Sequence, residues 1–299
     1  MNETQGRLPN FLCIGAPRSG TTWLYQNLKA HPEVFVPKDK EVTFFVPFGY
    51  RSNYYRGIKW YKSQFNFNTE CPIKAWGELS PRYYFSEGTP ELIASMIPDV
   101  KLIFLLRNPI EMLYSLYMYH VKLYLFTIDA NRYRFHDYLD HHLVEPLGYF
   151  AKYLKLYYQY FPREAILVRF YENLRENPSE NFKAISSFLK IDSSFDIPTV
   201  KDRVNTAVIP KHYTLSLISS YLPLGLPFRN LLSRIEKKYN RTEYRGKRNN
   251  GYVARETFFR LVKVYQQDVH ELEDMLNVDL SQWLDYEFLD SSMRQQAFS

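Results

Sequence analysis

The sequence predicts an α/β fold, a parallel sheet flanked by helices on both faces. Three observations predict it: short apolar runs alternate with longer helical patterns, the runs are apolar throughout, and each leads into a helix. Strands covered by helices on both sides of a parallel sheet have this pattern. No repeat or linker divides the 299 residues. We therefore expect a single domain over 1–299 with helical insertions and a core at about 10–285.

Each element follows from a local signal. The apolar runs predict strands over 11–15, 100–106 and 165–170. Helical patterns predict helices over 22–29, from 108 onward, and over 149–161, 179–189 and 255–276. Pro32 and Pro162 end two of these helices. Asn108, Pro109 and Glu111 are typical of the N-cap, first and third positions of a helix.

Composition restricts the function. Lys and Arg number 38 and Asp and Glu 32, which leaves a net charge of +6. This excess favours an anionic ligand but is too diffuse to indicate nucleic acid. Two cysteines cannot form a disulfide framework, so we expect a reducing, cytoplasmic location. The N-terminal residues lack the features of a secretory signal, and no apolar stretch approaches the roughly 20 residues of a membrane span.

A phosphate-binding turn follows the first strand. Gly15 and Gly20 bracket a loop that contains Arg18 and leads directly into a helix. Backbone amides converge at such a helix start, where the helix dipole favours an anion. The spacing of the two glycines is that of a nucleoside-triphosphate P-loop, but Thr21 stands where that loop has Lys. The sequence therefore predicts a P-loop-like sheet and a phosphate-bearing ligand, and it disfavours a Mg-dependent kinase.

A second anion site is predicted one strand away. Arg107 follows the strand over 100–106, and Ser115 lies about two turns into the next helix. Ligands of open α/β sheets bind outside the carboxyl ends of the strands. We therefore expect Arg107 and Ser115 to hold a second phosphate of the same ligand.

These segments together resemble the sulfotransferases that use 3′-phosphoadenosine 5′-phosphosulfate (PAPS). Residues 17–23 look like their 5′-phosphosulfate loop, and 100–109 with Ser115 look like their 3′-phosphate segment. Residues 40–45 are similar to the Lys-Glu-x-x-Phe-Phe stretch of carbohydrate sulfotransferases, and 166–174 look like the strand and turn of bacterial members. The resemblance covers most of 10–285. It implies transfer of a sulfuryl group from PAPS to a hydroxyl or amine, most readily of a carbohydrate, without a metal.

The resemblance also implies roles for single residues. The 5′ phosphate side of PAPS would be held by Arg18, Ser19, Gly20, Thr21, Thr22 and Trp23. Arg107 and Ser115 would hold the 3′ phosphate, and a basic loop that includes Arg248 would close over it. Arg18 stands where many members have Lys. Because Arg stays protonated, we expect it to stabilise charge on the leaving group and not to donate a proton.

Glu41 is the predicted general base, because it matches the carboxylate of the carbohydrate-type members. Phe44 and Phe45 would supply an apolar platform for a sugar. Glu78 and Ser80 are predicted to line the acceptor pocket, and Glu78 stays an alternative base. Leu79 stands where other members have a His or Lys, so one expected catalytic contact is missing here.

Other interpretations stay open. His120, His141 and His142 are further candidates for the base, although no metal-ligand spacing accompanies them. A small-molecule kinase is the first alternative function. A nucleotide- or glycan-binding protein that kept the fold without turnover is the second, and Leu79 is the feature that favours it.

Overall fold

The computed structural model describes residues 6–49, 52–68, 72–124, 135–141, 145–198, 208–210, 241–243 and 253–298. The chain divides into two compact units. Unit 1 comprises Met1–Asn108 and Tyr149–Val204, and unit 2 comprises Pro109–Gly148 and Asn205–Ser299. Each unit combines segments that are far apart in the sequence. The single domain expected from the sequence stays a prediction.

Unit 1 is built on a five-stranded sheet of order β2-β3-β1-β4-β5, in which every pair is parallel. The predicted strands and helices of this unit are confirmed, with ends that differ by up to three residues. Its elements are β1 (Phe11–Gly15), α1 (Thr21–Ala30), β2 (Val34–Phe35), η1 (Tyr54–Arg56), α2 (Gly57–Ser63), β3 (Ala75–Leu79), α3 (Thr89–Met96), β4 (Lys101–Leu106), α6 (Phe150–Tyr158), η3 (Arg163–Ala165), β5 (Ile166–Phe170), α7 (Tyr171–Glu176) and α8 (Pro178–Leu189).

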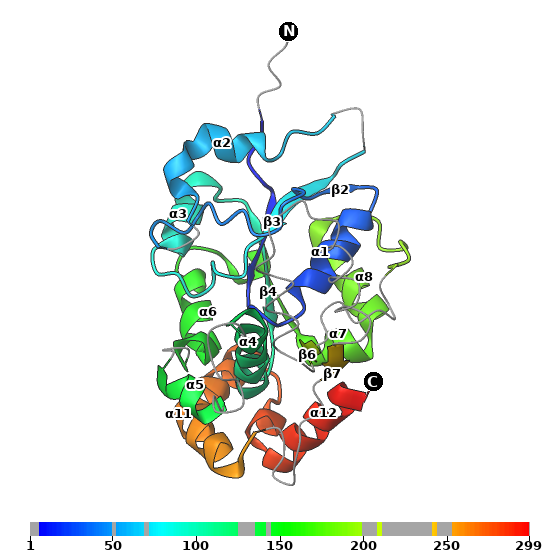
Figure 1. Ribbon diagram of the computed structural model, residues 1–299. Coiled ribbons are helices and arrows are strands. Elements are labelled where there is room, and N and C mark those ends of the chain that lie inside the picture. Colours follow the sequence, from blue (N-terminus) through cyan, green and yellow to red (C-terminus); the bar gives the residue numbers. More distant parts are fainter. Residues whose placement is uncertain are drawn as a thin grey trace, which may run out of the picture. The chain divides into compact units, whose positions relative to one another are not determined.

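Helices cover both faces of this sheet, as the uniformly apolar strands predict. One face packs against α1 and α8, through a core that includes Cys13, Leu24, Ile103 and Ile185. On the other face, the ring of Phe104 packs against residues that include Phe150 of α6. Figure 1 shows α1 and α8 on one side of the strands and α3 and α6 on the other. Both strand faces are therefore buried, and ligands reach the sheet at the ends of its strands.

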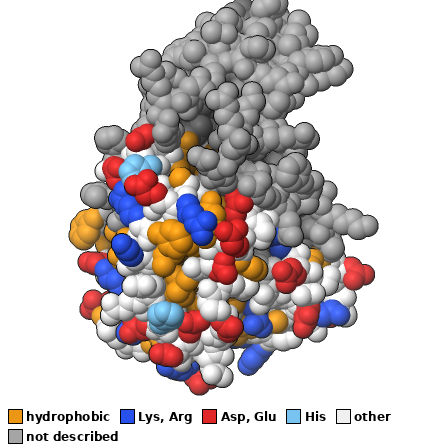
Figure 2. Space-filling view, turned by 90° about the horizontal axis from the view of Figure 1, so that it is seen from below, with side chains coloured by type: hydrophobic (Ala, Val, Ile, Leu, Met, Phe, Trp, Pro, Cys, Tyr) orange, Lys and Arg blue, Asp and Glu red, His pale blue; other side chains and the backbone are white. Residues whose placement is uncertain are grey.

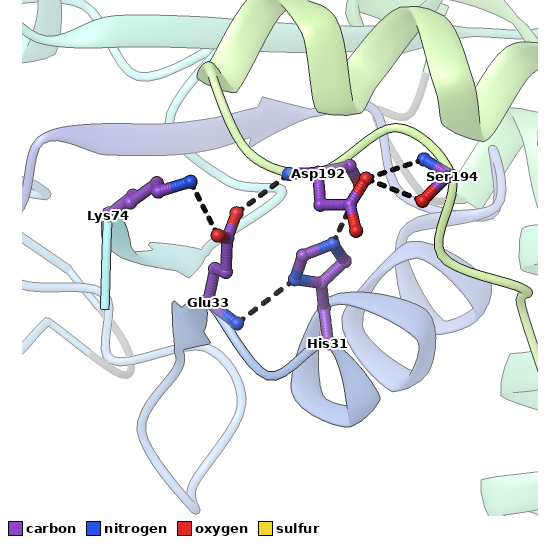
Figure 3. A network of polar contacts seen from close by, with 5 residues as sticks. All are labelled: His31, Glu33, Lys74, Asp192 and Ser194. Carbon is purple, nitrogen blue, oxygen red and sulfur yellow. Dashed lines mark hydrogen bonds and ion pairs between the residues drawn. The ribbon is translucent and has the colours of Figure 1, made fainter. Parts of the chain in front are cut away.

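A polar network fixes the end of unit 1 where α1 leads into β2 (Figure 3). His31 Nδ1 accepts a hydrogen bond from the amide of Glu33 at 3.1 Å, so the ring proton lies on Nε2, 2.9 Å from the carbonyl oxygen of Asp192. Glu33 accepts from the Asp192 amide at 2.7 Å and pairs with Lys74. Ser194 donates to the Asp192 carboxylate. The network ties the segment after α8 to the start of β2.

Unit 2 is mainly helical. It contains α4 (Pro109–Tyr124), α5 (Phe135–His141), η2 (Glu145–Gly148), β6 (Val208–Pro210), β7 (Arg241–Glu243), α11 (Arg255–Leu276), η4 (Ser281–Leu284) and α12 (Tyr286–Phe298). The helix predicted over 255–276 is confirmed. Polar contacts join its helices: Arg260 donates to Asp140 at 2.6 Å, and Ser292 donates to Glu111 at 2.9 Å.

The described surface carries charges of both signs. On the face seen in Figure 2, acidic and basic side chains are interspersed around a short apolar strip. Among the described helices, none combines the length and the apolar character that crossing a bilayer requires.

Candidate functional site

The candidate site lies in unit 1, at the carboxyl ends of four neighbouring strands. Because β3, β1, β4 and β5 are parallel neighbours, the residues that follow them meet at one edge of the sheet. These residues are Ser80 after β3, the turn 16–20 after β1, Arg107 after β4 and Tyr171 after β5. The predicted phosphate-binding turn and Arg107 therefore lie beside each other.

The turn after β1 presents the start of a helix to this edge. Arg18 has φ 61° and Gly20 has φ 91°, so two of its residues adopt left-handed conformations. Gly20 occupies the N-cap of α1, and no described side chain caps the helix there. The first turn of α1 contains no acidic residue. The backbone amides at the start of this ten-residue helix therefore create a positive potential, which favours a bound anion.

Close packing explains both glycines of the turn. A Cβ on Gly15 would lie 2.5 Å from the ring of Tyr84, which is fully buried. A Cβ on Gly20 would lie 3.3 Å from both Tyr171 and Leu174 of α7. A larger residue at position 15 would displace a core ring. At position 20 it would add strain, because a positive φ is costly for any side chain other than glycine.

Arg107 holds the turn directly. Its Nη1 donates a hydrogen bond to the carbonyl oxygen of Arg18 at 3.1 Å, and its side chain is only 6% exposed. The guanidinium also lies over the ring of Tyr171, 4.5 Å from its centroid. The planar guanidinium of an Arg carries five N–H donors in a fork that suits contact with phosphate oxygens. The two predicted anion-binding segments are therefore parts of one arrangement.

Tyr171 and Glu172 are further residues of this arrangement, which sequence reasoning did not select as site residues. Tyr171 lies between Gly20 and Arg107, and Glu172 Oε1 accepts a hydrogen bond from the amide of Asn108 at 2.9 Å. That amide precedes the first helical residue of α4. Both residues belong to the stretch 166–174, whose resemblance to bacterial members of the family is the sequence signal for them. Their contacts follow from the pairing of β4 with β5.

The predicted base, Glu41, lies in a short loop with unusual backbone geometry. Its φ is 70° and that of Thr43 is 50°, a costly conformation for a β-branched residue. The Glu41 side chain is 37% exposed and pairs with Lys40, with Oε1 2.9 Å from Nζ. It is thus accessible to a ligand. Its role as base stays a prediction.

Phe44 and Phe45 form the packed support of this loop. They are 1% and 0% exposed, and the ring of Phe44 stacks on Tyr61 with centroids 4.3 Å apart. Neither ring presents an open face in this structure, because both are buried in the core of unit 1. Contact of these rings with a sugar stays a prediction that the packing does not favour.

Glu78, predicted to line the acceptor pocket, is the centre of a buried network. It is 1% exposed, and its Oε1 accepts hydrogen bonds from Tyr61 at 2.8 Å and Tyr83 at 2.6 Å, while Oε2 accepts from Ser80 at 2.5 Å. Burial raises the pKa of this carboxyl, and the hydrogen bonds from Ser80, Tyr83, Tyr61 and the Thr43 amide act in the opposite direction. Hydrogen bonds to a charged group contribute about 1.5–3 kcal/mol each.

The other residues predicted to hold the 5′ phosphate side of PAPS lie in the turn after β1 and in the first turn of α1. Ser19 is buried, and its hydroxyl lies 3.4 Å from the carbonyl oxygen of Pro17. Thr21 is buried and Thr22 half-buried in the first turn of α1. Trp23 packs edge-on against Phe182 in the core, with centroids 6.2 Å apart. Binding of a nucleotide by these residues stays a prediction.

Other predicted residues belong to unit 2 or lie outside the described residues. Ser115 is half-buried in α4 of unit 2, and its part in the site stays a prediction. His120 Nδ1 lies 2.9 Å from the hydroxyl of Tyr138, also in unit 2. Arg248 and His142 lie outside the described residues, as does the side chain of His141. Within the described ranges, no group of three or more His, Cys, Asp or Glu is arranged to hold a metal ion.

The arrangement can bind and stabilise developing negative charge. The start of α1 and the guanidinium of Arg107 lie at one edge of the sheet, where Arg107 bonds to the backbone of Arg18, and a partly exposed carboxylate lies in the loop that follows α1 and β2. Preorganised donors of this kind lower the free energy of a transition state in which a phosphate gains charge. The chemistry that suits the site is therefore group transfer from a phosphate leaving group.

Comparison with known proteins agrees with this chemistry. A family model described as the sulfotransferase domain matches residues 8–213, well over half of the chain. The chain is 30% identical over 202 residues to bifunctional heparan sulfate N-deacetylase/N-sulfotransferase 2 of Homo sapiens, with 63% of this chain and 23% of that protein covered. Bifunctional heparan sulfate N-deacetylase/N-sulfotransferase 3 of Homo sapiens is 30% identical over 201 residues, with the same coverage of both chains. The chain thus spans about a quarter of the length of these curated relatives.

Solved structures show the same fold. A sulfotransferase from Alicyclobacillus acidocaldarius superimposes with a TM-score of 0.66 at 22% identity, over 93% of this chain and 100% of that one. Mouse sulfotransferase SULT7A1, solved in complex with PAP, superimposes with a TM-score of 0.51 at 15% identity, over 94% and 88% of the two chains. At these identities the likeness concerns the fold.

Proposed function

Because the chain belongs to the sulfotransferase domain family, we propose that it transfers a sulfuryl group from PAPS to a hydroxyl or amine of a carbohydrate acceptor. The products are the sulfated acceptor and adenosine 3′,5′-bisphosphate (PAP). The observation that carries the proposal is the hydrogen bond from Arg107 to the carbonyl oxygen of Arg18, beside the uncapped start of α1. It brings the guanidinium of Arg107, which follows β4, to the turn between β1 and the start of α1.

This arrangement fits a nucleotide with phosphates at two positions. The amides of Gly20 and Thr21 and the side chain of Arg18 suit the 5′ phosphate, since a helix N-terminus with an added cation is a strong anion site. Arg107 suits the 3′ phosphate, which PAPS has and ATP lacks. A Lys after Gly20, which a Mg-dependent kinase uses, is replaced by Thr21. PAPS is therefore a better fit than a nucleoside triphosphate.

The residues of the chain then divide the chemistry between them. Bound PAPS supplies a sulfuryl group attached to a phosphate leaving group. Arg18 remains protonated, so it stabilises the negative charge that develops on the leaving phosphate. Glu41 accepts the proton of the acceptor hydroxyl or amine, a role that needs a carboxylate within hydrogen-bond reach of the acceptor. Positioning supplies much of the remaining rate, as it does in phosphoryl transfer.

A carbohydrate acceptor is supported by two observations. The curated relatives are named for N-sulfotransfer on heparan sulfate, and the stretch 40–45 is similar to that of carbohydrate-type members. The partly exposed Glu41 with its neighbour Lys40 can meet a polar acceptor such as a saccharide. A hydroxyl and an amine remain equivalent for this site, because both lose a proton to the base.

The proposal is tested by transfer of label from ³⁵S-PAPS to a panel of saccharides with free hydroxyls or amines, with phenols and lipid alcohols as comparison acceptors. Label on a saccharide that depends on the protein, and that is unchanged by EDTA, supports the proposal. The Glu41→Gln variant, which is expected to bind PAPS but not to transfer, serves as the matched control for label that does not depend on the chain's own chemistry. Label on phenols or lipid alcohols alone would contradict a carbohydrate acceptor and keep the sulfotransferase activity. An absence of label on all acceptors would contradict the activity itself.

A further inference from the structure

We propose that Glu78 is a positioning residue that holds the loop 41–45 in its active conformation and so fixes where Glu41 meets the acceptor. The inference rests on the proposed function, because it takes Glu41 as the base. Glu78 itself is 1% exposed and reaches the acceptor only through this loop. Its carboxylate is surrounded by three hydroxyl donors from Tyr61, Ser80 and Tyr83.

Two of these hydroxyls connect Glu78 to the loop. Ser80 Oγ donates to Glu78 and accepts from the amide of Thr43 at 3.0 Å. The Tyr83 hydroxyl donates to Glu78 and accepts from the amide of Phe45 at 3.2 Å. Each hydroxyl has one proton, which it donates to the carboxylate in a hydrogen bond. Its oxygen therefore acts as an acceptor toward the loop. By accepting from both hydroxyls, the carboxyl oxygens of Glu78 thus set the direction of both hydrogen-bond chains.

The other backbone groups of the loop are also held by distant side chains. Asn53 Nδ2 donates to the carbonyl oxygen of Val42 at 2.9 Å, and Thr89 Oγ1 donates to that of Phe45 at 2.6 Å. The backbone N–H of Asn53 donates to the carbonyl oxygen of Thr43 at 3.2 Å. Buried backbone groups need such partners, and this loop obtains them from outside its own segment. Its shape is therefore imposed by the surrounding structure.

The loop requires this support because its backbone is strained. Glu41 and Thr43 have φ values of 70° and 50°, and neither is a glycine. Conformations of this kind persist only where surrounding contacts over-determine them. The Ser80 link ends at the amide of Thr43, one of the two strained residues. Loss of the network should let this segment relax toward a negative φ and displace the Glu41 carboxylate.

The main test compares Tyr83→Phe with Tyr61→Phe. Both variants remove one hydroxyl that donates to Glu78 Oε1, but only the Tyr83 hydroxyl also accepts from a loop amide. We expect Tyr83→Phe to lower the turnover number about tenfold or more and to leave the KM for PAPS unchanged. We expect Tyr61→Phe to keep the wild-type turnover number, because its ring still stacks on Phe44.

Glu78→Gln and Ser80→Ala extend the test. Gln is isosteric with Glu, but its amide nitrogen donates and reverses one of the hydrogen-bond chains. Both variants should lower turnover as Tyr83→Phe does. Amide exchange gives a readout without an acceptor: we expect Phe45 to exchange about tenfold faster in Tyr83→Phe and Thr43 in Ser80→Ala, while both keep the wild-type rate in Tyr61→Phe.

The outcomes separate this inference from the proposed function. Wild-type turnover in Glu78→Gln and Tyr83→Phe, or unchanged exchange at Thr43 and Phe45, would overturn the role of Glu78. A fully active Glu41→Gln variant would remove Glu41 as the base, and with it the catalytic purpose of the loop. A wild-type chain that transfers no label contradicts the proposed function, whereas the exchange rates still decide whether Glu78 orders the loop.

Discussion

The guanidinium of Arg107 donates a hydrogen bond to the backbone carbonyl oxygen of Arg18, with Nη1 3.1 Å from the oxygen. The two residues follow the neighbouring parallel strands β4 and β1 and are 89 positions apart in the chain. The side chain that is proposed to hold the 3′ phosphate thus also supports the turn that is proposed to hold the 5′ phosphate. We therefore expect this contact to couple the binding of the two ends of one nucleotide.

Replacement of Arg107 should weaken PAP binding. Arg107→Ala removes a charged donor, and hydrogen bonds to charged groups contribute about 1.5–3 kcal/mol, which corresponds to roughly a tenfold to hundredfold loss of affinity. PAP should raise the Tm of the wild type more than ADP does, and the variant should lose most of this difference. Arg175→Ala, on the exposed side of α7, is the control. Equal Tm shifts from PAP and ADP in the wild type would contradict the second anion site.

Replacement of Arg18 should lower turnover more than donor binding. A lost stabilising group at a developing anion costs about 2.7–4 kcal/mol in the activation free energy, or roughly 100- to 1,000-fold in rate. Arg18→Gly is a useful second variant, because glycine accepts the φ of 61° without strain. If the turnover is lost because the positive charge is missing and not because the backbone is strained, the Ala and Gly variants should lose turnover equally. An unchanged turnover number in both variants would remove the assigned role.

Replacement of Glu41 should abolish transfer and spare the donor site. Glu41→Gln keeps the size of the side chain but cannot take a proton, and loss of a general base typically costs about 100- to 10,000-fold. Titration with PAP should give the wild-type Kd, because the Glu41 carboxylate is proposed to contact the acceptor. Glu87→Gln, at an exposed position, serves as control. Retained transfer would point to another base.

Gly20 should be more sensitive to substitution than Gly88. Both occupy helix N-caps with left-handed geometry, at φ 91° and φ 82°. A Cβ on Gly20 would meet Tyr171 and Leu174 at 3.3 Å, whereas a Cβ on Gly88 would meet no described atom within 4 Å. Gly88→Ala should cost about 1 kcal/mol from backbone strain, and Gly20→Ala should cost more and weaken PAP binding. Thermal unfolding of both variants checks this, and equal losses would exclude a packing role for Gly20.

Glu33 should make stability depend on pH in the acid range. Hydrogen bonds from Lys74 and the Asp192 amide lower the pKa of its carboxyl (Figure 3). A carboxyl with a lowered pKa in the folded state stabilises the protein above its ordinary pKa of about 4.3, and this contribution is lost as the pH falls through the lowered value. Glu33→Gln should therefore lower the Tm at pH 7 and have progressively less effect below about pH 4. Glu176→Gln is the exposed control, and an effect independent of pH would contradict the ionic origin.

Local sequence signals predicted β1, α1, β4, α6, β5 and α8 of unit 1, and the start of α4 and all of α11 in unit 2. The strand over 11–15 and the helix over 255–276 have the predicted bounds, and β4 and β5 begin one residue later than expected. Periodicity did not predict β2, β3, α2, α3, α5, α7 or α12, because these are short or weakly patterned segments. The start of α4 at Pro109 was predicted from Asn108 and Pro109, yet the amide of Asn108 bonds to Glu172 on a segment more than 60 residues away.

The sequence by itself determined that a glycine-bracketed turn and an arginine each follow an apolar strand, because hydrophobic patterns and helix-start signals act over a few residues. Only the tertiary structure decided that β1 and β4 are neighbours, that Arg107 bonds to Arg18, and that Tyr171 packs between Gly20 and Arg107. It also decided that Glu78 is buried among hydroxyls. Such contacts depend on strand order and close packing across distant segments, which no local pattern encodes.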